Sequence, residues 1–468
     1  MRIEHDFIGQ MEISDEVYYG IQTLRASENF FITNDKLCSY PVFIKSFAQV
    51  KKAAALANAP LDLIEEKLKI EICHTCDLLI DGNYHDKFIL DMIHGGDDTR
   101  TNMNMNEVIA NLALEYMGHQ KGEYQFCHPN DHVNRSQSTN DAYPSALIIA
   151  IYERLSNLVA PMKALRDAFA QKAKEFAHVI KMGRTQLQDA VPMTLGQEFD
   201  TYALMVDRDI EQVLDARNWV RELNLGGTAI GTGINSHPDY RSLIEKKIQE
   251  VTGRPFVMAN NLIEATQSTG AYVQVSGVLK RIAVKLSKVC NDLRLLSSGP
   301  RAGLNEINLP KMQPGSSIMP GKVNPVIPEV VNQVCFAVIG NDLSVALAAE
   351  GGQLQLNVFE PVIAYKLFHS FVILGRAIET LTTKCVEGIT ANEKICHDYV
   401  FNSIGIVTAL NPHIGYEKSA MIAKEALKSD RSIYDIALEK KILTKEQLDD
   451  IFKPENMLSP HAFKKHKD

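Results

Sequence analysis

The sequence has few aromatic residues and no surplus of positive charge. It contains one Trp among 468 residues, and Phe, Trp and Tyr together make up 7% of the chain. Lys and Arg number 49 against 57 Asp and Glu, so the net charge at neutral pH is −8. A general nucleic-acid binder needs a basic surface and often stacking rings. We therefore expect no nucleic-acid partner.

Long uninterrupted apolar runs are also missing. The longest candidate, residues 146–151, is soon followed by Glu153 and Arg154, whereas a membrane-spanning helix needs about 20 apolar residues. The N-terminus, residues 1–6, lacks the basic and then apolar layout of a secretory signal. These absences predict no membrane partner and a cytoplasmic location.

The eight cysteines are scattered, and only Cys73 and Cys76 form a CxxC spacing. In a chain of this length, such cysteines read as free thiols in a reducing compartment. No second CxxC accompanies the pair, and the apolar spacing around it is helical. We therefore interpret Cys73 and Cys76 as helix thiols and expect no metal site there.

The sequence contains no complete nucleotide-binding motif. In residues 315–325 (GSSIMPGKVNP), five residues separate the two glycines and Val323 follows Lys322, which excludes a P-loop. The glycine-rich residues 226–233 lack the third glycine of a dinucleotide-binding motif. No GxSxG or HExxH sequence is present either. We expect an enzyme or binding protein that needs no cofactor.

Helical periodicity dominates what is present. Apolar residues at 275, 279, 282, 286, 289, 293 and 296 alternate steps of four and three, which predicts a long helix packed nearly parallel to others. Shorter stretches at 155–169 and 199–206 repeat the pattern, the first interrupted by Pro161, where a helix starts or kinks. Few runs alternate at period 2, so the fold class is mainly α.

Residues 330–349 are apolar on almost every face, and a helix of this kind must be buried on all sides. A few long helices of one chain do not surround it easily. We infer a central long-helix bundle completed by other copies of the chain, with a large monomeric helical domain as the alternative.

Hydroxyl and amide side chains gather in three polar stretches, residues 130–141, 183–189 and 315–325. Such groups suit a carboxylate-binding site, although each stretch taken alone is also typical of helix capping. Serine is a poor base unless backbone N–H groups or a cation stabilise its alkoxide. The glycine-bracketed turn before Lys322 offers both.

Residues 315–325 resemble the signature loop of the fumarase/aspartase superfamily, and residues 130–144 and 183–198 resemble its other two site regions. The resemblance covers essentially the whole chain, including residues 18–25, 352–357 and 402–406. Residues 102–108, 118–124 and 137–144 are most similar to the members that deaminate aspartate. Fumarases typically have His in place of Gln186 and often Ser in place of Thr139.

The resemblance implies a three-domain fold with an N-terminal helical domain (1–140), a central helix-bundle domain (141–394) and a small C-terminal domain (395–468). It implies a homotetramer in which three subunits share each site. The implied reaction is the reversible deamination of L-aspartate to fumarate and ammonia through an aci-carboxylate, without cofactor or metal. By match to the motifs, Ser316 is the catalytic base. The residues implied to hold the two carboxylates are Thr99, Ser138, Thr139, Asn140, Thr185, Ser317, Lys322 and Asn324.

One loop departs from the family pattern. Where the superfamily has a small, glycine-containing loop, this chain places Asp97, Asp98 and Arg100 around Thr99. A residue that replaces glycine at positive φ is strained, and new carboxylates repel a dianionic substrate. Altered specificity, impaired activity and a silent loop change are the open outcomes. Fumarate hydratase activity and a catalytically silent homologue are the alternative functions.

Overall fold

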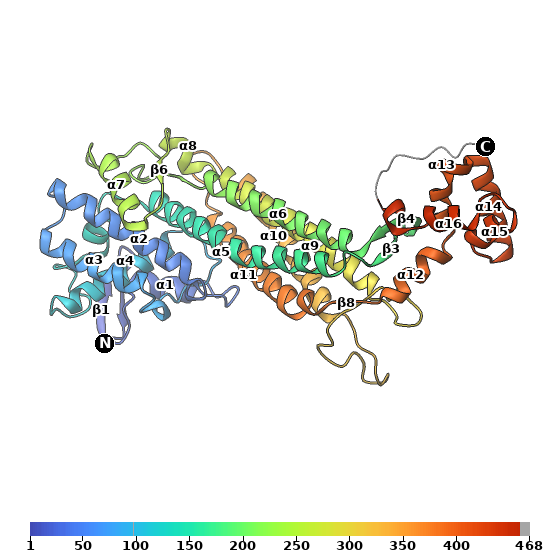
Figure 1. Cartoon of the computed structure of the whole chain (residues 1–468). Helices are drawn as coiled ribbons and strands as arrows, with labels where there is room; N and C mark the ends of the chain where they lie inside the picture. Colours follow the sequence, from blue (N-terminus) through green and yellow to red (C-terminus); the bar gives the residue numbers. More distant parts are fainter. Residues whose placement is uncertain (97, 459–468) are drawn as a thin grey trace. The chain divides into compact units, whose positions relative to one another are not determined.

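A computed structural model describes residues 1–96 and 98–458 and shows a mainly helical protein (Figure 1). Asp97 and the basic tail at 459–468 lie outside the described residues. The chain divides into two compact units. Unit 1 comprises Met1–Ala160, Glu211–Ala283 and Phe336–Gly375, and unit 2 comprises Pro161–Ile210, Val284–Cys335 and the chain from Arg376 onward. The domain boundaries expected at 140/141 and 394/395 stay a prediction.

Unit 1 contains the first site stretches. The shorter helices α2, α3 and α4 pack on one another, and α1 packs on α4. Strands β1 and β2 pair antiparallel, and β5 and β6 pair parallel. The bounds are β1 (Arg2–His5), β2 (Gln10–Ile13), α1 (Ile21–Asn29), α2 (Pro41–Asn58), α3 (Glu66–Ile80), α4 (Thr99–Tyr116), η4 (Pro129–Val133), β5 (Glu222–Leu223), α7 (Tyr240–Thr252), β6 (Val257–Met258) and α8 (Leu262–Gln267).

The long helices confirm the helical predictions. They are α5 (Thr139–Glu175), α6 (Leu195–Trp219), α9 (Gly270–Leu296), α10 (Val326–Glu350) and α11 (Glu360–Lys384). The heptad pattern of residues 275–296 lies within α9, and α5 runs through Pro161, so no helix starts there. The boundary between the units passes through each of these helices.

The long helices pack against one another within each unit. In unit 1, Asn341 of α10 donates to Ser370 of α11 at 3.0 Å, and Ser276 of α9 donates to Asp342 of α10 at 2.8 Å. In unit 2, Asn332 of α10 donates to the carbonyl of Ser287 in α9. Buried polar side chains thus find partners on neighbouring helices, as buried polar groups require.

Unit 2 adds the hairpin β3–β4 and the C-terminal helices. Its C-terminal core joins Met182 of β3 to Val400, Leu410, Ile422 and Leu448, all fully buried. Four two-stranded sheets make up the sheet structure of the described residues, which agrees with the small expected β content. The bounds in unit 2 are β3 (Ile180–Thr185), β4 (Gln188–Thr194), β7 (Ile307–Asn308), β8 (Thr390–Ala391), α12 (Glu393–Asn402), η6 (Ile404–Leu410), α13 (Asn411–Ile414), α14 (Tyr416–Ser429), α15 (Ile433–Glu439), α16 (Lys445–Ile451) and α17 (Pro454–Met457).

Two helical stretches require a correction to the sequence analysis. Val326–Glu350 and Glu360–Gly388 are long and apolar enough to cross a membrane by length and composition alone. The expectation that no segment is long and apolar enough for a membrane span is therefore wrong. A few polar or charged residues interrupt the apolar run, but the mean hydropathy over the helix stays high. The core helix of a soluble protein meets the same criteria. In α10 only 33% of the apolar window is buried within the single chain.

The cysteines all lie within the described residues, and none of them forms a disulfide. Cys73 and Cys76 lie on α3, which confirms the helical reading of the CxxC pair. Burial raises the pKa of the Cys73 thiol to about 11, so its reactive thiolate form is scarce at neutral pH.

Candidate functional site

A buried carboxylate places the start of α1 against α4. Glu107 of α4 accepts hydrogen bonds from the backbone N–H groups of Gly20, Gln22 and Thr23 and from the Thr23 hydroxyl. The first N–H groups of a helix lack partners within it, and a carboxylate there also meets the positive end of the helix dipole. Burial raises the pKa of Glu107 to about 7, although these donors act in the opposite direction.

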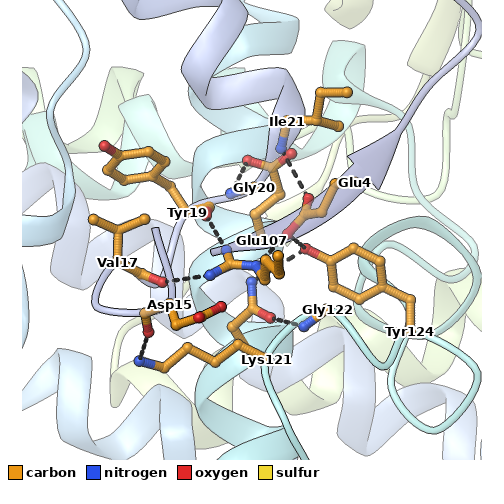
Figure 2. A network of polar contacts seen from close by, with 12 residues as sticks. Glu4, Asp15, Val17, Tyr19, Gly20, Ile21, Glu107, Lys121, Gly122 and Tyr124 are labelled. Atoms are coloured by element: carbon orange, nitrogen blue, oxygen red, sulfur yellow. Dashed lines mark hydrogen bonds and ion pairs between the residues drawn. The ribbon is translucent and has the colours of Figure 1, made fainter. Parts of the chain in front are cut away.

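A second carboxylate extends this network, which Figure 2 shows. Glu4 of β1 accepts from the backbone N–H of Ile21 at 2.9 Å and from the Tyr124 hydroxyl at 3.0 Å. The Arg2 guanidinium pairs with Glu4 at 2.7 Å and donates to the carbonyl of Tyr19. Residues 19–21, which lead into α1, are therefore held at a carbonyl by Arg2 and at an N–H group by Glu4.

This arrangement positions the atypical loop before Thr99. Gln22, in the first turn of α1, accepts a hydrogen bond of 2.9 Å from Nη1 of Arg100. Asp98 is buried and has φ of 57°, in the left-handed region, immediately before α4. Asp98 therefore meets the condition of positive φ under which a residue in place of glycine is strained, although aspartate enters this region more readily than most non-glycine residues. Thr99 is the first residue of α4.

The start of α4 lies beside the start of α5. Asn102, one turn after Thr99, donates from Nδ2 to Oγ1 of Thr139 at 3.1 Å. Ser138 precedes α5, and its Oγ accepts from the backbone N–H of Asn140 at 3.3 Å. Both hydroxyl oxygens therefore accept a hydrogen bond and keep their own proton for donation, which is what a carboxylate site needs.

Asp141 organises this corner of unit 1. Its Oδ1 accepts from the backbone N–H of Ser138 at 2.9 Å, which is the half of a capping box made by the third helical residue; Oγ of Ser138 caps the N–H of Asn140 instead. The capping interpretation thus applies to Ser138 and Asp141, and it leaves the Ser138 proton available. Burial raises the pKa of Asp141 to about 6, against the effect of its hydrogen-bond donors.

The glycine-rich residues 226–233 have a structural role that the failed nucleotide motif did not reveal. The N–H groups of Gly226 and Thr228 donate to Oδ2 of Asp141 at 3.1 and 2.9 Å. The carbonyl of Ala229 accepts from Nδ2 of Asn140 at 2.8 Å. At Gly231, φ is 93° and an added Cβ would lie 2.4 Å from the backbone of Ile263, so only glycine fits.

Lys51 lies next to the residues at the starts of α4 and α5, and its place there was not predicted from the sequence. It is fully buried on α2, and its ammonium donates to side-chain oxygens of Asn102, Asn134 and Gln137 at 2.7, 2.9 and 3.0 Å. A signal exists in the sequence, since Lys51 follows Phe47 by four residues and therefore shares its apolar helix face.

In unit 2, Thr185 lies at the exposed tip of the β3–β4 hairpin. Gln186 and Leu187 have φ of 54° and 62°, as a tight two-residue hairpin turn requires. Strand β3 is held by Glu306, which is fully buried and pairs with Lys181 near the base of the hairpin at 3.0 Å and with Arg184 next to its tip at 2.7 Å. Burial alone lowers the pKa of Lys181, but neighbouring carboxylates, that of Glu306 among them, outweigh it and raise the pKa.

Backbone N–H groups surround the Ser316 hydroxyl oxygen, as expected for a serine that acts as a base. Its Oγ accepts from the backbone N–H groups of Ile318 and Met319 at 3.2 and 3.0 Å. Two oriented N–H groups stabilise an alkoxide at this oxygen. Ser317 and Lys322 are exposed on the same loop.

The loop is closed at its base. The N–H of Gly315 donates to the carbonyl of Lys322 at 2.8 Å, and Nδ2 of Asn324 donates to the carbonyl of Gly315 at 2.9 Å. An added Cβ at Gly315 would lie 2.8 Å from the backbone N of Asn324. Asn324 therefore shapes the loop and has its Oδ1 left for other contacts.

The structure thus divides the nine expected site residues between its two units. Unit 1 holds Thr99, Ser138, Thr139 and Asn140, and unit 2 holds Thr185, Ser316, Ser317, Lys322 and Asn324. Among residues 1–96 and 98–458, no hydrogen bond joins the Thr185 turn to residues 315–324. Nor does this part of the chain contain three or more His, Cys, Asp or Glu side chains placed to hold a metal ion.

Comparison with known proteins gives matches along the whole chain. The profile described as Lyase matches residues 9–340, and that described as Fumarase C C-terminus matches residues 406–459. The aspartate ammonia-lyase of Helicobacter pylori (strain J99) is 97% identical over 468 residues, which is 100% of each chain. That of Escherichia coli (strain K12) is 54% identical over 461 residues, covering 98% of this chain and 96% of the other.

Solved structures agree with the sequence matches. The fumarate lyase:delta crystallin from Brucella melitensis, solved bound to cobalt, superimposes with a TM-score of 0.96 at 50% identity. The match covers 98% of this chain and 100% of that one. The same fold is therefore present over nearly the whole length.

Proposed function

The chain belongs to the lyase family of the fumarase/aspartase superfamily, and from this we propose that it catalyses the reversible deamination of L-aspartate to fumarate and ammonia. The observation that carries the choice of aspartate is the 97% identity, over the full length of both chains, to the aspartate ammonia-lyase of Helicobacter pylori. The Ser316 turn, in which two backbone N–H groups point at the hydroxyl oxygen, supplies the base. The chemistry of this reaction requires a base for a weakly acidic C–H proton, and a stabilised serine alkoxide is such a base.

The reaction begins with proton transfer from C3 of aspartate to Oγ of Ser316. The electrons of the C3–H bond move into the adjacent carboxylate, which becomes a doubly charged aci-carboxylate. They then form the C2–C3 double bond while the C2–N bond breaks and its electron pair leaves with nitrogen. Fumarate and ammonia are the products, and no hydride or external electron acceptor is needed.

The other site residues have an electrostatic task. The charge on the aci-carboxylate exists only after proton removal, so donors aimed at it lower the barrier more than they strengthen substrate binding. Lys322 is the cation of the Ser316 loop, and Ser317, Thr185 and Asn324 supply neutral donors from unit 2. We assign Thr99, Ser138, Thr139 and Asn140 to the carboxylates from unit 1.

The test is one preparation assayed with aspartate and, separately, with malate. We expect fumarate absorbance to rise with aspartate and not with malate, and the rise to be about a thousandfold slower in Ser316→Ala. Fumarate from malate but not from aspartate would identify a hydratase and contradict the proposal. No turnover of either substrate by the native chain would identify a catalytically silent homologue.

We further infer that the chain forms a homotetramer in which three subunits contribute to each site. The apolar residues Phe336, Leu343 and Leu347 of α10 are 60%, 62% and 63% exposed in the single chain. Their spacing of seven and four residues places them on one helix face. An exposed apolar stripe of this kind is costly in water and suits burial against other copies.

Light scattering on Leu343→Asp tests this assembly. A charge on the stripe should dissociate the tetramer and remove activity, because each site then lacks residues from the other subunits. Leu427→Asp is the matched control, since Leu427 is 71% exposed on α14 and should leave both mass and activity unchanged. A native chain that is monomeric and active would overturn the inference.

A further inference from the structure

The fully buried Lys51 is connected to the hydroxyl of Thr139 through the side chain of Asn102. The Lys51 ammonium has three N–H bonds, and each is directed at a side-chain oxygen, those of Asn102, Asn134 and Gln137. Its charge also lies 5.5 Å from the centroid of the Phe47 ring. A buried ammonium is costly unless all its donors are satisfied, so the three acceptors together hold it in place.

The ammonium decides which way the Asn102 amide faces. An amide has a donor side and an acceptor side, and only its oxygen can accept from Lys51. Oδ1 of Asn102 therefore faces Lys51 at 2.7 Å, and Nδ2 faces Oγ1 of Thr139 at 3.1 Å. Nδ2 also donates to Oδ1 of Asn134 at 3.2 Å, an oxygen that Lys51 itself holds. With the amide reversed, an NH₂ group would face the ammonium.

The Asn102 amide in turn decides what the Thr139 hydroxyl can do. Oγ1 of Thr139 accepts from Asn102, so its proton must be donated elsewhere. Within residues 1–96 and 98–458, the Thr139 hydroxyl accepts this bond and donates none. Thr139 is the first residue of α5, next to Ser138 and Asn140.

We propose that Lys51 is a positioning residue for the reaction. By fixing the Asn102 amide, it makes Asn102 donate to Thr139 and directs the Thr139 proton to a carboxylate of the substrate. The inference rests on the proposed function. It adds a buried residue, two hydrogen bonds from Thr139 and three from the substrate, that determines how tightly a dicarboxylate is held.

The charge state of Lys51 gives the proposal a pH signature. A neutral amine has two N–H bonds for three acceptors, so loss of the proton releases one amide. Burial lowers the pKa of Lys51 to about 7, which places this change near neutral pH. The titratable groups that face Lys51 are Asp141 of α5 and the Cys76 thiol of α3, and both raise its pKa. Binding of a dianion nearby also favours the charged form.

The experiment is a double-mutant cycle on kcat/KM for aspartate with Lys51→Met, Thr139→Val and the double variant. Each single change should lower kcat/KM about tenfold or more, mainly through KM, as expected for loss of a charge-assisted hydrogen bond. If Lys51 acts through Thr139, the double variant is no worse than Thr139→Val alone. Multiplied losses in the double variant would overturn the proposal.

Lys52→Met is the matched control. Lys52 lies next to Lys51 on α2 and pairs with Asp77 at 2.5 Å near the surface. It should keep kcat/KM within about twofold of the native value. An equal loss in Lys52→Met and Lys51→Met would mean that α2 is merely perturbed, which contradicts the proposal.

A binding measurement covers the case in which Lys51→Met fails to fold. Succinate is mostly a dianion above pH 6.5 and only gains negative charge as pH rises, so its own titration cannot produce a Kd that increases with pH. The Kd of the native protein should rise about tenfold as pH increases through 7, and Thr139→Val should lose most of that dependence. A flat native profile would overturn the proposal. If the protein binds succinate with this profile but releases no fumarate from aspartate, the proposed function fails and the positioning role stands.

Discussion

Nη1 of Arg100 donates to Oε1 of Gln22 at 2.9 Å, which joins the first turn of α4 to the first turn of α1. The guanidinium of the atypical loop is therefore bound to a neighbouring helix. This geometry favours a scaffold role over direct contact with the substrate.

We expect Arg100→Ser to change the KM for aspartate by less than about threefold and to lower the free energy of unfolding by about 1 kcal/mol, the usual value of one such hydrogen bond. Gln22→Ala should cost a similar amount, and the two changes together should cost no more than either alone. Denaturant titration and initial-rate kinetics check both parts. A KM raised tenfold or more in Arg100→Ser would make Arg100 a substrate contact.

Asp98 should weaken aspartate binding through its charge. Two charges about 7 Å apart repel by roughly 2 kcal/mol at an effective dielectric near 20, and salt reduces this. Asp98→Asn should therefore raise kcat/KM about fivefold while the backbone, at φ of 57°, stays the same. Asp98→Gly should give the same kinetic gain and relieve about 1 kcal/mol of left-handed strain in addition.

The salt dependence of KM separates charge from strain at this position. The native enzyme should show a falling KM as salt increases, and Asp98→Asn should show less of this effect. Unchanged kinetics in both variants would mean that the loop change is silent.

Ser316→Ala should lower kcat by about a thousandfold, within the 10²- to 10⁴-fold range typical of removing a general base. The backbone N–H groups of Ile318 and Met319, which donate to its Oγ, lose their acceptor but stay solvated on an exposed loop. Ser317→Ala is the comparison variant, and because it removes one neutral donor and keeps the base, it should lower kcat much less than Ser316→Ala does. Steady-state assays at saturating aspartate distinguish the two, and a kcat above a tenth of native in Ser316→Ala would remove it as the base.

Lys322→Ala should cost about 2–4 kcal/mol of transition-state stabilisation, judged from deletion of oxyanion-hole donors. This corresponds to a loss of roughly 30- to 1,000-fold in kcat/KM. Lys428→Ala, on an exposed lysine near the end of α14, is the control and should retain native activity. Near-native kcat/KM in Lys322→Ala would exclude the lysine from the mechanism.

His94 should make the fold sensitive to mild acid. Burial lowers its pKa from 6.5 to about 4, and its Nε2 lies 2.9 Å from the Thr101 hydroxyl. The unfolded chain binds this proton more readily, so stability present above pH 6.5 is lost as pH falls toward 4. The loss is about 2–3 kcal/mol. Urea midpoints at pH 7.5 and 4.5 should differ less in His94→Gln, and an equal difference would contradict this origin.

The sequence by itself determined the long helices and the backbone environment of Ser316. Both depend on residues near one another in the chain. The step of three and four residues marks a helix face, and the glycines at 315 and 321 bracket a turn whose own N–H groups reach the serine. The site residues were predicted by resemblance of such local motifs, and the structure divides them between its two units.

Only the tertiary structure decided how those residues are held. Lys51 and Asn102 are 51 positions apart, Gln22 and Arg100 are 78 apart, and Asp141 and Gly226 are 85 apart. Each contact joins separate elements, and no spacing rule of a helix or a strand connects such positions. A hydrogen bond also depends on the direction of its donor. The orientation of the Asn102 amide, and with it the direction of the Thr139 O–H bond, therefore follows from the packing of α2, α4 and α5. No local pattern of residues specifies that packing.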